Sequence, residues 1–478
     1  MLSLLRLFDL RLAGVVLLFG AAGCAHTSPA SPSRDGALLI TGITIVDVAG
    51  SGSVRLNQTI LVRGDRIAEV GDAGSVEVPS GVRVVDGRGK FAIPGLWDMH
   101  VHFMNTGPSA LPLYIANGIT SVREMGGYLD STRAWQARMA AGTMTGPRFK
   151  TPGPILENPR YLAGVRERDK GLGGRLAPRV LPYRIGVADS ADASRAVDSL
   201  RRLSVDFIKI RTVASPASYR AILSAAKQAG LTVAGHAPGV VSLAAASDAG
   251  QKSIEHGFYP PTSLLPDSAR SDIHARFARN GTWYTPTLTV SRAVQVQPDS
   301  ANELIWGPRA TSLDPARQYA SDWLLGWWRM QVDERERESD SARASNRRAY
   351  ESSLADVREM SKAGVRILAG TDAGSVLVYP GFTLHEELRL LVEDAKLTPS
   401  QALWSATLGP ALFFGMERDL GTIEQGRIAD IVLLDSDPFS NIRNTRRISA
   451  VIQGGRLFNR AALDLLLEGV RREVSHNR

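Results

Sequence analysis

The sequence predicts an α/β protein in which a (β/α)8 TIM-like barrel is inserted into a small β-sandwich formed by both chain ends. Eight strand-like runs alternate with helical runs between Pro94 and about Phe414, which is the pattern of a parallel barrel. Short alternating apolar segments, typical of antiparallel strands, fill residues 37–92 and return only at 421–435 and 448–458. Because neither set of end segments can bury a good core alone, we expect the two ends to pair.

The domain boundaries follow from the same patterns. We expect residues 37–93 plus 415–460 to form the β-sandwich domain, residues 94–414 to form the barrel, and residues 461–478 to form a C-terminal amphipathic helix and tail. The length of 478 residues is enough for one large domain and a smaller one.

The alternation also places the barrel elements. Strands are expected at residues 95–103, 119–125, 148–155, 205–212, 231–236, 252–256, 282–290 and 365–371, and helices at residues 109–117, 132–141, 190–203, 216–229, 242–249 and 265–280. Two connections are too long to be plain links. They run from Glu157 to Arg184, rich in Gly, Pro and Arg, and from Asp299 to Leu354, a helical stretch with three tryptophans. Each either forms a lid over the pocket or packs on the outside of the barrel.

The first residues have the pattern of an export signal. A basic start with Arg6 and Arg11 precedes an apolar run from Leu12 to Gly20, and a small-residue stretch ends at Cys24. The run is shorter than the about 20 apolar residues of a membrane-spanning helix. The segment resembles a bacterial lipoprotein signal, which implies that residues 1–23 are removed and that Cys24 carries lipid; the alternative is an ordinary secreted signal cut nearby.

Residues 24–36 contain much Ser, Pro and Ala and are expected to form a flexible tether. We therefore expect an exported protein, anchored to a membrane through lipid at Cys24 and facing the periplasm or the cell surface. Cys24 is the single cysteine of the chain, so no internal disulfide can form.

The formal net charge of +8 does not by itself indicate a nucleic-acid partner. The arginines are scattered, as in residues 160–184 and 335–348, and no DNA- or RNA-binding motif accompanies them. We expect a solvated basic surface, a small-molecule substrate and no nucleic-acid partner.

Candidate metal ligands begin at the first barrel strand, which ends in His100 and His102. Side chains alternate along a strand, so both imidazoles point the same way, with Asp98 one step deeper on that face. Two buried histidines without a metal are the alternative for so short a motif. Asp98 either orients a ligand or is simply buried with a hydrogen bond to the backbone.

Four further candidates stand at the ends of other strand-like runs: Lys209, His236, His256 and Asp372. A lysine flanked by Phe207, Ile208 and Ile210 is unusual, because a buried ammonium needs a partner or must lose its charge. Reaction with carbon dioxide gives a carbamate anion that can bridge two cations; pairing with a nearby carboxylate is the alternative. Four imidazoles and two oxygen anions suit a pair of divalent ions such as zinc, with manganese, cobalt and iron also compatible.

These motifs together resemble the amidohydrolase superfamily, in its prolidase-like and imidazolonepropionase-like branch. The motifs are Pro-Gly-x-x-Asp-x-His-x-His (94–102), Asp-Phe-Ile-Lys-Ile (206–210), Gly-His-Ala (235–237), Ile-Glu-His-Gly (254–257), Gly-Thr-Asp-Ala-Gly (370–374) and a tail over 420–432. The resemblance implies that His100, His102 and Asp372 hold one metal, that His236 and His256 hold the other, and that carboxylated Lys209 bridges them. Imidazolonepropionases resemble mononuclear enzymes without that lysine, so Lys209 favours the binuclear, prolidase-like side.

These parts predict a mechanism of hydrolysis. A water shared by two cations loses its proton near neutral pH, and the hydroxide attacks a carbonyl whose oxygen contacts a metal. Asp372 takes the proton and later delivers it to the leaving nitrogen. We expect cleavage of an amide or related C–N bond in a dipeptide or N-acyl amino acid. Alternatives are a cyclic-amide or lactone hydrolase on the same scaffold and, less favoured, an inactive solute-binding lipoprotein.

Substrate contacts are predicted at three positions. Arg211 shares a strand face with Lys209 and could bind a carboxylate, or it could be a salt-bridged wall residue. Tyr259 follows His256 in a loop over the pocket, and His385 follows the eighth strand, where capping or packing of the next helix is the alternative. Residues 235–238, Gly-His-Ala-Pro, depart from the His-Ala-His pattern of prolidase-like members, so Xaa-Pro dipeptides cannot be assumed as substrates.

Overall fold

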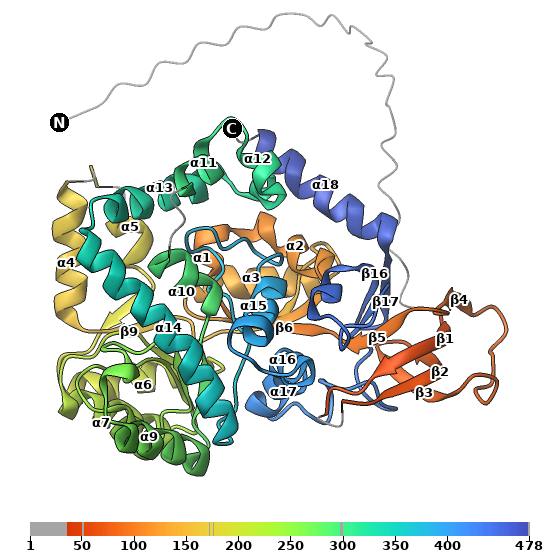
Figure 1. Ribbon diagram of the computed structural model, residues 1–478, viewed down its shortest axis with the longest axis horizontal. Coiled ribbons are helices and arrows are strands. Elements are labelled where there is room, and N and C mark those ends of the chain that lie inside the picture. The colour runs from red at the N-terminus through yellow and green to blue at the C-terminus, as the bar shows by residue number, and fades with distance from the viewer. Residues whose placement is uncertain (1–35, 50–51, 172, 175, 297–299, 477–478) are drawn as a thin grey trace, which may run out of the picture. The chain divides into compact units, whose positions relative to one another are not determined.

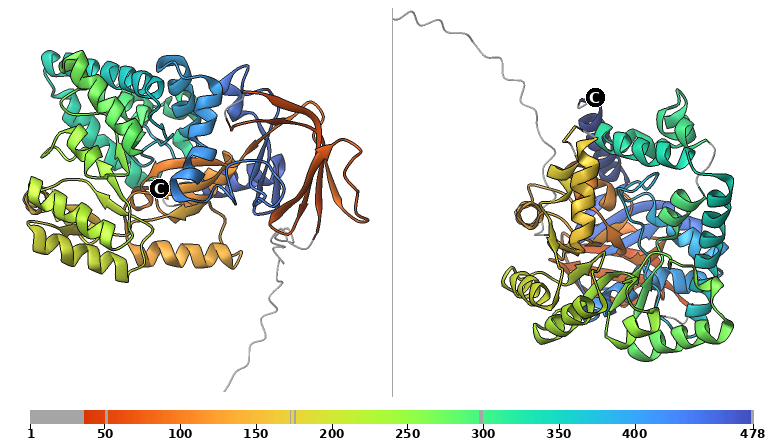
Figure 2. Two further views of the ribbon diagram at one scale, coloured as in Figure 1. Left: turned by 90° about the horizontal axis from the view of Figure 1, so that it is seen from below. Right: turned by 90° about the vertical axis from the view of Figure 1, so that its left-hand side faces the viewer.

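A computed structural model describes residues 36–49, 52–171, 173–174, 176–296 and 300–476 (Figures 1 and 2). The expected signal peptide (1–23), Cys24 and nearly all of the expected tether (24–36) lie outside these residues. Among the helices in the described ranges, none has the length and hydropathy that crossing a membrane requires.

Parallel chain segments follow one another around the barrel. Its strands are β6 (Leu96–Val101), β7 (Ile119–Glu124), β8 (Arg148–Lys150), β9 (Ile155–Glu157), β11 (Ile208–Ile210), β12 (Val233–His236), β13 (Ser253–Glu255) and β14 (Trp283–Thr285). β8 and β9 are two parts of the third segment, because β8 pairs with β7 and β9 pairs with β11. The eighth segment, residues 365–373, bridges to Tyr284 of β14 through Ile367 and to Val101 of β6 through Ala373. The ladder thus returns to its first strand, and the predicted barrel is confirmed.

Helices cover the outside of the barrel, as the sequence predicted. They are α2 (Leu111–Ala116), α3 (Leu129–Ala140), α6 (Ser190–Arg202), α7 (Pro216–Gln228), α8 (Leu243–Asp248) and α9 (Asp267–Asn280). Of these, α6 packs beside α7, and α8 packs beside α9. In α6 the buried residues are Ala193, Ala196, Val197 and Leu200, the spacing of one helical face.

One predicted strand is too long. Residues 282–290 were expected to be strand throughout, but β14 ends at Thr285 and α10 (Leu288–Gln295) begins three residues later. Pro286 has no N–H to continue the ladder, and Thr287 has a left-handed backbone with φ of 48°, so the chain turns there.

The two long connections fold into helices. The first contains α4 (Pro159–Lys170), α5 (Ala177–Val180) and a short strand, β10 (Arg184–Gly186), which pairs with β9. The second contains α11 (Ala301–Trp306), α12 (Ala310–Leu313), η3 (Pro315–Tyr319), α13 (Asp322–Glu336) and the start of α14 (Asp340–Lys362). Below we call them the first and second insertion.

Both chain ends build one sheet, as predicted. Its order is β17-β16-β15-β5-β1-β2-β3, with β4 on β1, and its strands are β1 (Leu38–Val46), β2 (Val54–Arg63), β3 (Arg66–Asp72), β4 (Arg83–Asp86), β5 (Phe91–Pro94), β15 (Ile431–Leu434), β16 (Ile448–Gln453) and β17 (Arg456–Asn459). The strands form one continuous ladder. It encloses a core, because Ile60 of β2 and Ile452 of β16 belong to the same buried apolar cluster. Gly455, in the turn between β16 and β17, lies against the turn between β2 and β3. A Cβ at Gly455 would lie 1.8 Å from the Gly64 carbonyl oxygen, so only glycine fits there.

The remaining helices lie in the connections of the barrel, between the barrel and the sheet, and at the C-terminal end. They are α1 (Phe103–Thr106), η1 (Pro108–Ala110), η2 (Thr262–Leu264), α15 (Leu384–Arg389), η4 (Leu390–Asp394), α16 (Pro399–Ser405), α17 (Leu408–Phe414), η5 (Ile442–Arg446) and α18 (Arg460–His476). The predicted C-terminal helix is α18 (Figure 1). It buries Val470 and Val474 against Leu113 of α2.

Candidate metal centre

The six predicted ligands stand at the carboxyl ends of barrel segments. His100 lies in β6 and His102 directly follows it, Lys209 lies in β11, His236 ends β12, His256 follows β13, and Asp372 lies in the eighth segment. Parallel strands bring their carboxyl ends to one face of a barrel, so the six side chains converge. We call these six residues the metal centre. A cavity of about 230 Å³, which we call the centre cavity, is lined by all of them except His100, which is fully buried.

Side-chain distances confirm the convergence. His102 Nε2 lies 3.1 Å and His100 Nε2 lies 3.4 Å from Asp372 Oδ1. The ring of His256 is 4.5 Å from that of His100 and 4.7 Å from that of His236. Potential donor atoms of His100, His256 and Asp372 all lie within 4.8 Å of one another, so these three residues could hold a metal ion.

The protonation of His100 is set by a buried carboxylate. Glu255 Oε2 lies 3.1 Å from His100 Nδ1 and also accepts a hydrogen bond of 2.6 Å from Arg123 Nη2. A carboxylate paired with Arg accepts, so His100 Nδ1 carries the proton. His100 Nε2, which is buried and without a hydrogen-bond partner in the described part of the chain, therefore presents its lone pair to the centre.

The hydroxyl of Thr287 determines the tautomer of His256. The Thr287 hydroxyl donates to the Pro286 carbonyl (2.8 Å), so toward His256 Nδ1, at 2.8 Å, it accepts. His256 Nδ1 thus carries the proton, and the other ring nitrogen is left with its lone pair. Both tautomers are those of metal-binding histidines.

Three residues of this site have a left-handed backbone conformation, which residues other than glycine rarely adopt. The φ angles are 68° at His256, 48° at Thr287 and 64° at Asp372. Each such residue costs about 1–3 kcal/mol, and such strain persists where the surrounding structure over-determines it. Its concentration at two predicted ligands and the partner of one of them marks a functional site.

Asp98 ties the first strand to the eighth segment. Its Oδ1 accepts from the backbone N–H of His100 (3.2 Å) and of Thr371 (3.0 Å), and its Oδ2 accepts from the Thr371 hydroxyl (2.6 Å). Asp98 thus holds the backbone of His100 beside that of Asp372. The close approach requires Gly370, since a Cβ there would lie 2.9 Å from His100 Cβ.

Burial keeps His100, His236 and His256 neutral. It lowers the pKa of His100 and of His236 well below the usual value, and that of His256 to about 4. Burial also lowers the pKa of Lys209 to about 8. Burial opposes ionisation of Asp372, but the hydrogen bond with His102 holds its pKa well below the usual value. Neutral imidazoles beside an ionised carboxylate are the donor set that a divalent metal requires.

A model of the amidohydrolase family matches residues 91–458. The chain belongs to the amidohydrolase family. The predicted family and its enzyme class, hydrolases acting on carbon–nitrogen bonds, are thereby confirmed, and amidohydrolases generally use divalent metal.

The chain is similar to several known proteins. Ochratoxinase of Aspergillus niger is 25% identical over 414 residues, which cover 77% of this chain and 75% of that protein. Imidazolonepropionase of Symbiobacterium thermophilum is 24% identical over 419 residues, covering 83% and 89%. A solved Xaa-Pro dipeptidase with bound methionine has the same fold, with a TM-score of 0.65, 21% identity, and coverage of 89% and 100%.

Of the three predicted substrate contacts, only Arg211 is among the described residues that line the centre cavity. Its Nη1 lies 3.5 Å from Glu157 Oε1, and its guanidinium lies 4.3 Å from the Tyr161 ring centre. Arg184 pairs with the same Glu157 oxygen, so two guanidinium groups share one carboxylate.

The structure places Tyr259 and His385 elsewhere. Tyr259 is 89% exposed and is not among the residues that line the centre cavity. His385 is buried in α15, where Nδ1 contacts Thr445 Oγ1 (3.0 Å) and Nε2 contacts the Asn117 carbonyl (3.1 Å). Both ring nitrogens of His385 thus serve the packing of α15, which was the alternative to substrate binding.

Sequence patterns missed several partners of the ligands. Arg123 pairs with Glu255 rather than with the adjacent Glu124, which accepts from Gly126 N and Thr151 Oγ1. Ser375 was also missed; its hydroxyl donates to Asp372 Oδ2 (2.7 Å). The adjacency of Glu255 to His256 was the one available signal.

Both insertions reach the centre. Tyr161, Val180 and Tyr183 of the first and Trp327 and Gln331 of the second line the centre cavity. Of the two alternatives for the insertions, the structure therefore favours a cover over the site.

Proposed function

We propose that this amidohydrolase cleaves an amide of a small substrate, of the dipeptide or N-acyl amino acid type, with the help of divalent metal at the centre. The observation that carries the proposal is the pair of fixed tautomers: Glu255 and Thr287 leave the lone pairs of His100 and His256 facing Asp372. Among the described residues, no protein group forms a hydrogen bond with the buried His100 Nε2, so a cation fits there.

The donors divide into two sets, as the family resemblance implies. His100, His102 and Asp372 would hold one ion, and His236 and His256 the other, with carboxylated Lys209 between them. Lys209 is 1% exposed, and its Nζ has no hydrogen-bond partner among the residues described. An isolated buried ammonium is costly, and a carbamate would convert it into an anion with two cationic partners. Zinc suits the N and O donors; manganese, cobalt or iron would also fit.

When bound, the metal would polarise the substrate carbonyl and lower the pKa of water. The protein side chains supply the remaining steps. Asp372 would accept the proton of the attacking water and return it to the leaving nitrogen. Ser375 supports this role, since its hydroxyl holds Asp372 Oδ2 in place while Oδ1 faces the two histidines.

Arg211 is the proposed contact for a substrate carboxylate. Arg184 and Arg211 share the single carboxylate of Glu157, so the local charge is positive. A terminal carboxylate of a dipeptide or N-acyl amino acid would balance it.

Export and lipid attachment at Cys24 are proposed on the sequence pattern alone. Expression in a bacterial host with a radiolabelled fatty acid tests this: the parent should be labelled and a Cys24→Ala variant should not. A secreted, unlabelled parent would support the ordinary signal instead.

Metal content tests the centre. Elemental analysis of the protein lacking residues 1–23 should find about two equivalents in the parent and a clear loss in Lys209→Ala. Lys150→Ala is the matched control, because Lys150 lies on β8, in the barrel segment before β11, and pairs with Asp206 at 2.9 Å. One equivalent that survives Lys209→Ala would refute the bridge and favour a cyclic-amide hydrolase of mononuclear type.

Activity tests the reaction. A panel of dipeptides, N-acyl amino acids, cyclic amides and lactones should show hydrolysis of open-chain amides, abolished in Asp372→Asn. Hydrolysis confined to cyclic amides or lactones would contradict the proposed substrate class.

A further inference from the structure

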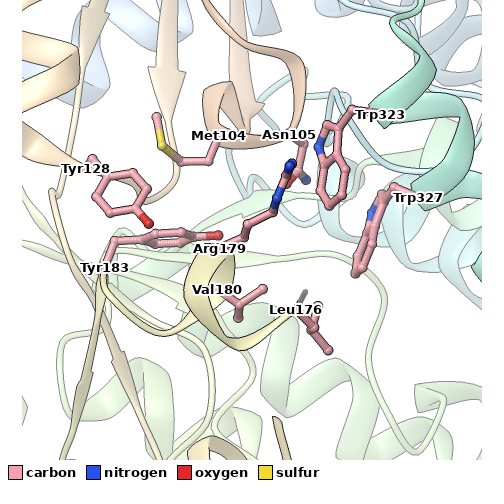
Figure 3. A pocket seen from close by; sticks show the side chains of 9 residues that line it. All are labelled: Met104, Asn105, Tyr128, Leu176, Arg179, Val180, Tyr183, Trp323 and Trp327. Carbon is pink, nitrogen blue, oxygen red and sulfur yellow. The ribbon is translucent and has the colours of Figure 1, made fainter. Parts of the chain in front are cut away.

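A pocket of about 140 Å³ lies between the two insertions. Its walls come from four parts of the chain: Met104 in α1, Tyr128 before α3, Leu176 and Tyr183 of the first insertion, and Trp323 and Trp327 of α13. Figure 3 shows these side chains facing one another across the pocket. We call it the ring pocket.

The ring pocket adjoins the centre cavity. Met104, Asn105, Val180, Tyr183 and Trp327 line both. A substrate whose scissile bond lies at the metal centre can therefore extend a side group between the insertions.

The lining suits a flat apolar group. The Tyr128 and Tyr183 rings are 5.2 Å apart at 67°, and the Trp323 and Trp327 rings are 6.5 Å apart at 22°. Aromatic edges and faces attract a further ring, and the thioether of Met104 does so too. An apolar cavity of about 150 Å³ is known to hold benzene, so the volume fits a single six-membered ring.

A cation–π contact forms the outer wall and joins the insertions. The guanidinium of Arg179 lies 3.6 Å from the ring centre of Trp323, and Figure 3 shows its side chain extending alongside that ring. The Tyr128 hydroxyl donates to the Pro178 carbonyl (3.2 Å), which positions α5 and hence Arg179. Trp323 is thus held by a residue of the first insertion, and it is not among the described residues that line the centre cavity.

We propose that the ring pocket binds an aromatic ring of the substrate, so that the enzyme prefers small amides that carry one phenyl-sized group. This inference rests on the proposed amide hydrolysis. Trp323 and Trp327 are the residues that determine the preference, and the Arg179–Trp323 contact fixes the outer wall.

Three substrates test the preference: N-acetylglycine, N-acetyl-L-phenylalanine and N-phenylacetylglycine. In the parent, kcat/KM for at least one ring substrate should exceed that for N-acetylglycine about tenfold or more. In Trp323→Ala this ratio should fall about tenfold, the size of one aromatic contact. The ring substrate that is preferred identifies the side of the amide that enters the pocket.

Trp306→Ala is the matched control. Trp306 is 37% exposed against 39% for Trp323, lies in the same insertion, and has Arg329 5.2 Å from its ring centre, but it is not part of the ring pocket lining. This variant should retain the parental ratio. If N-acetylglycine is hydrolysed and the ratio is the same in the parent and in Trp323→Ala, the ring pocket is refuted while the proposed function stands.

Binding to metal-free protein separates the two proposals. Ligand-detected NMR should show benzyl alcohol bound by the parent and by Trp306→Ala, about tenfold more weakly by Trp323→Ala, with ethanol as the ringless comparison. If no amide is hydrolysed but this pattern holds, the ring pocket stands and the proposed function fails. Equal binding by all three proteins, or none, refutes the ring pocket.

Discussion

Replacing Glu255 by Gln keeps the shape of the side chain and removes its charge. In the folded protein the carboxylate lies 2.6 Å from Arg123 Nη2 and 3.1 Å from His100 Nδ1, and all three side chains are at most 1% exposed. An amide can donate as well as accept, so it would no longer require the proton of His100 to sit on Nδ1. His100 Nε2 would then lose its fixed lone pair.

Two separate costs follow. Arg123 would keep its hydrogen bonds to the Met99 carbonyl (2.6 Å) and Ser253 Oγ (3.0 Å) but lose its counter-charge. Removing one partner of a buried ion pair leaves the other charge without its counter-charge, and it typically lowers the free energy of unfolding by about 3–5 kcal/mol. Losing the group that orients a metal-binding histidine typically weakens metal affinity by about 10–100-fold.

Denaturant unfolding of metal-free protein and competitive zinc titration measure the two costs. The double variant Arg123→Met, Glu255→Gln should recover much of the stability, because no charge is stranded, yet still bind zinc weakly. Glu124→Gln is the control: Glu124 is equally buried but bonds Gly126 and Thr151, so zinc affinity should stay parental. Parental zinc affinity in Glu255→Gln would refute the role assigned to Glu255.

Three further outcomes are expected. Gly370→Ala should lower both stability and zinc affinity, as a Cβ there would crowd His100, whereas Gly164→Ala meets no atom within 4 Å and should behave like the parent. Burial raises the pKa of Asp356 to about 7, so its folded form binds a proton more tightly than the unfolded chain. The stability that Asp356 contributes is thus present below about pH 4 and lost as pH rises to 7. At pH 8 the free energy of unfolding of Asp356→Asn should exceed that of the parent by up to about 4 kcal/mol, whereas at pH 4 the two should be equal. Equal pH profiles in denaturant titrations would contradict this. Chelation of bound metal should lower the melting temperature by several degrees, since metal in about thousandfold excess over its Kd adds about 4 kcal/mol, and an unchanged melting curve would argue against a metal centre.

Local sequence patterns predicted the barrel and the position of each candidate ligand. Apolar runs ending in a polar side chain indicate both a buried strand and the end at which that side chain lies. In a parallel barrel those ends share one face, so His100, Lys209 and His256 could be grouped without any knowledge of distances. The return of alternating segments after Phe414 likewise predicted that the two chain ends would pair, as β15 and β5 do.

Partners distant in sequence could not be assigned in this way. Arg123 has Glu124 beside it in the chain, yet strand alternation turns Glu124 away and the barrel brings Glu255 within reach. Tyr259 is near His256 in sequence, but the fold leaves its ring 89% exposed.

The sequence by itself determined the fold class, the family motifs and the donor types of the centre, because periodicity and residue chemistry are local properties. Tertiary structure alone decided the tautomers of His100 and His256, the sharing of Glu157 between two arginines, and the ring pocket. The pocket joins Tyr183 to Trp323, on separate insertions. Such contacts depend on how the insertions pack over the barrel, which no local pattern specifies.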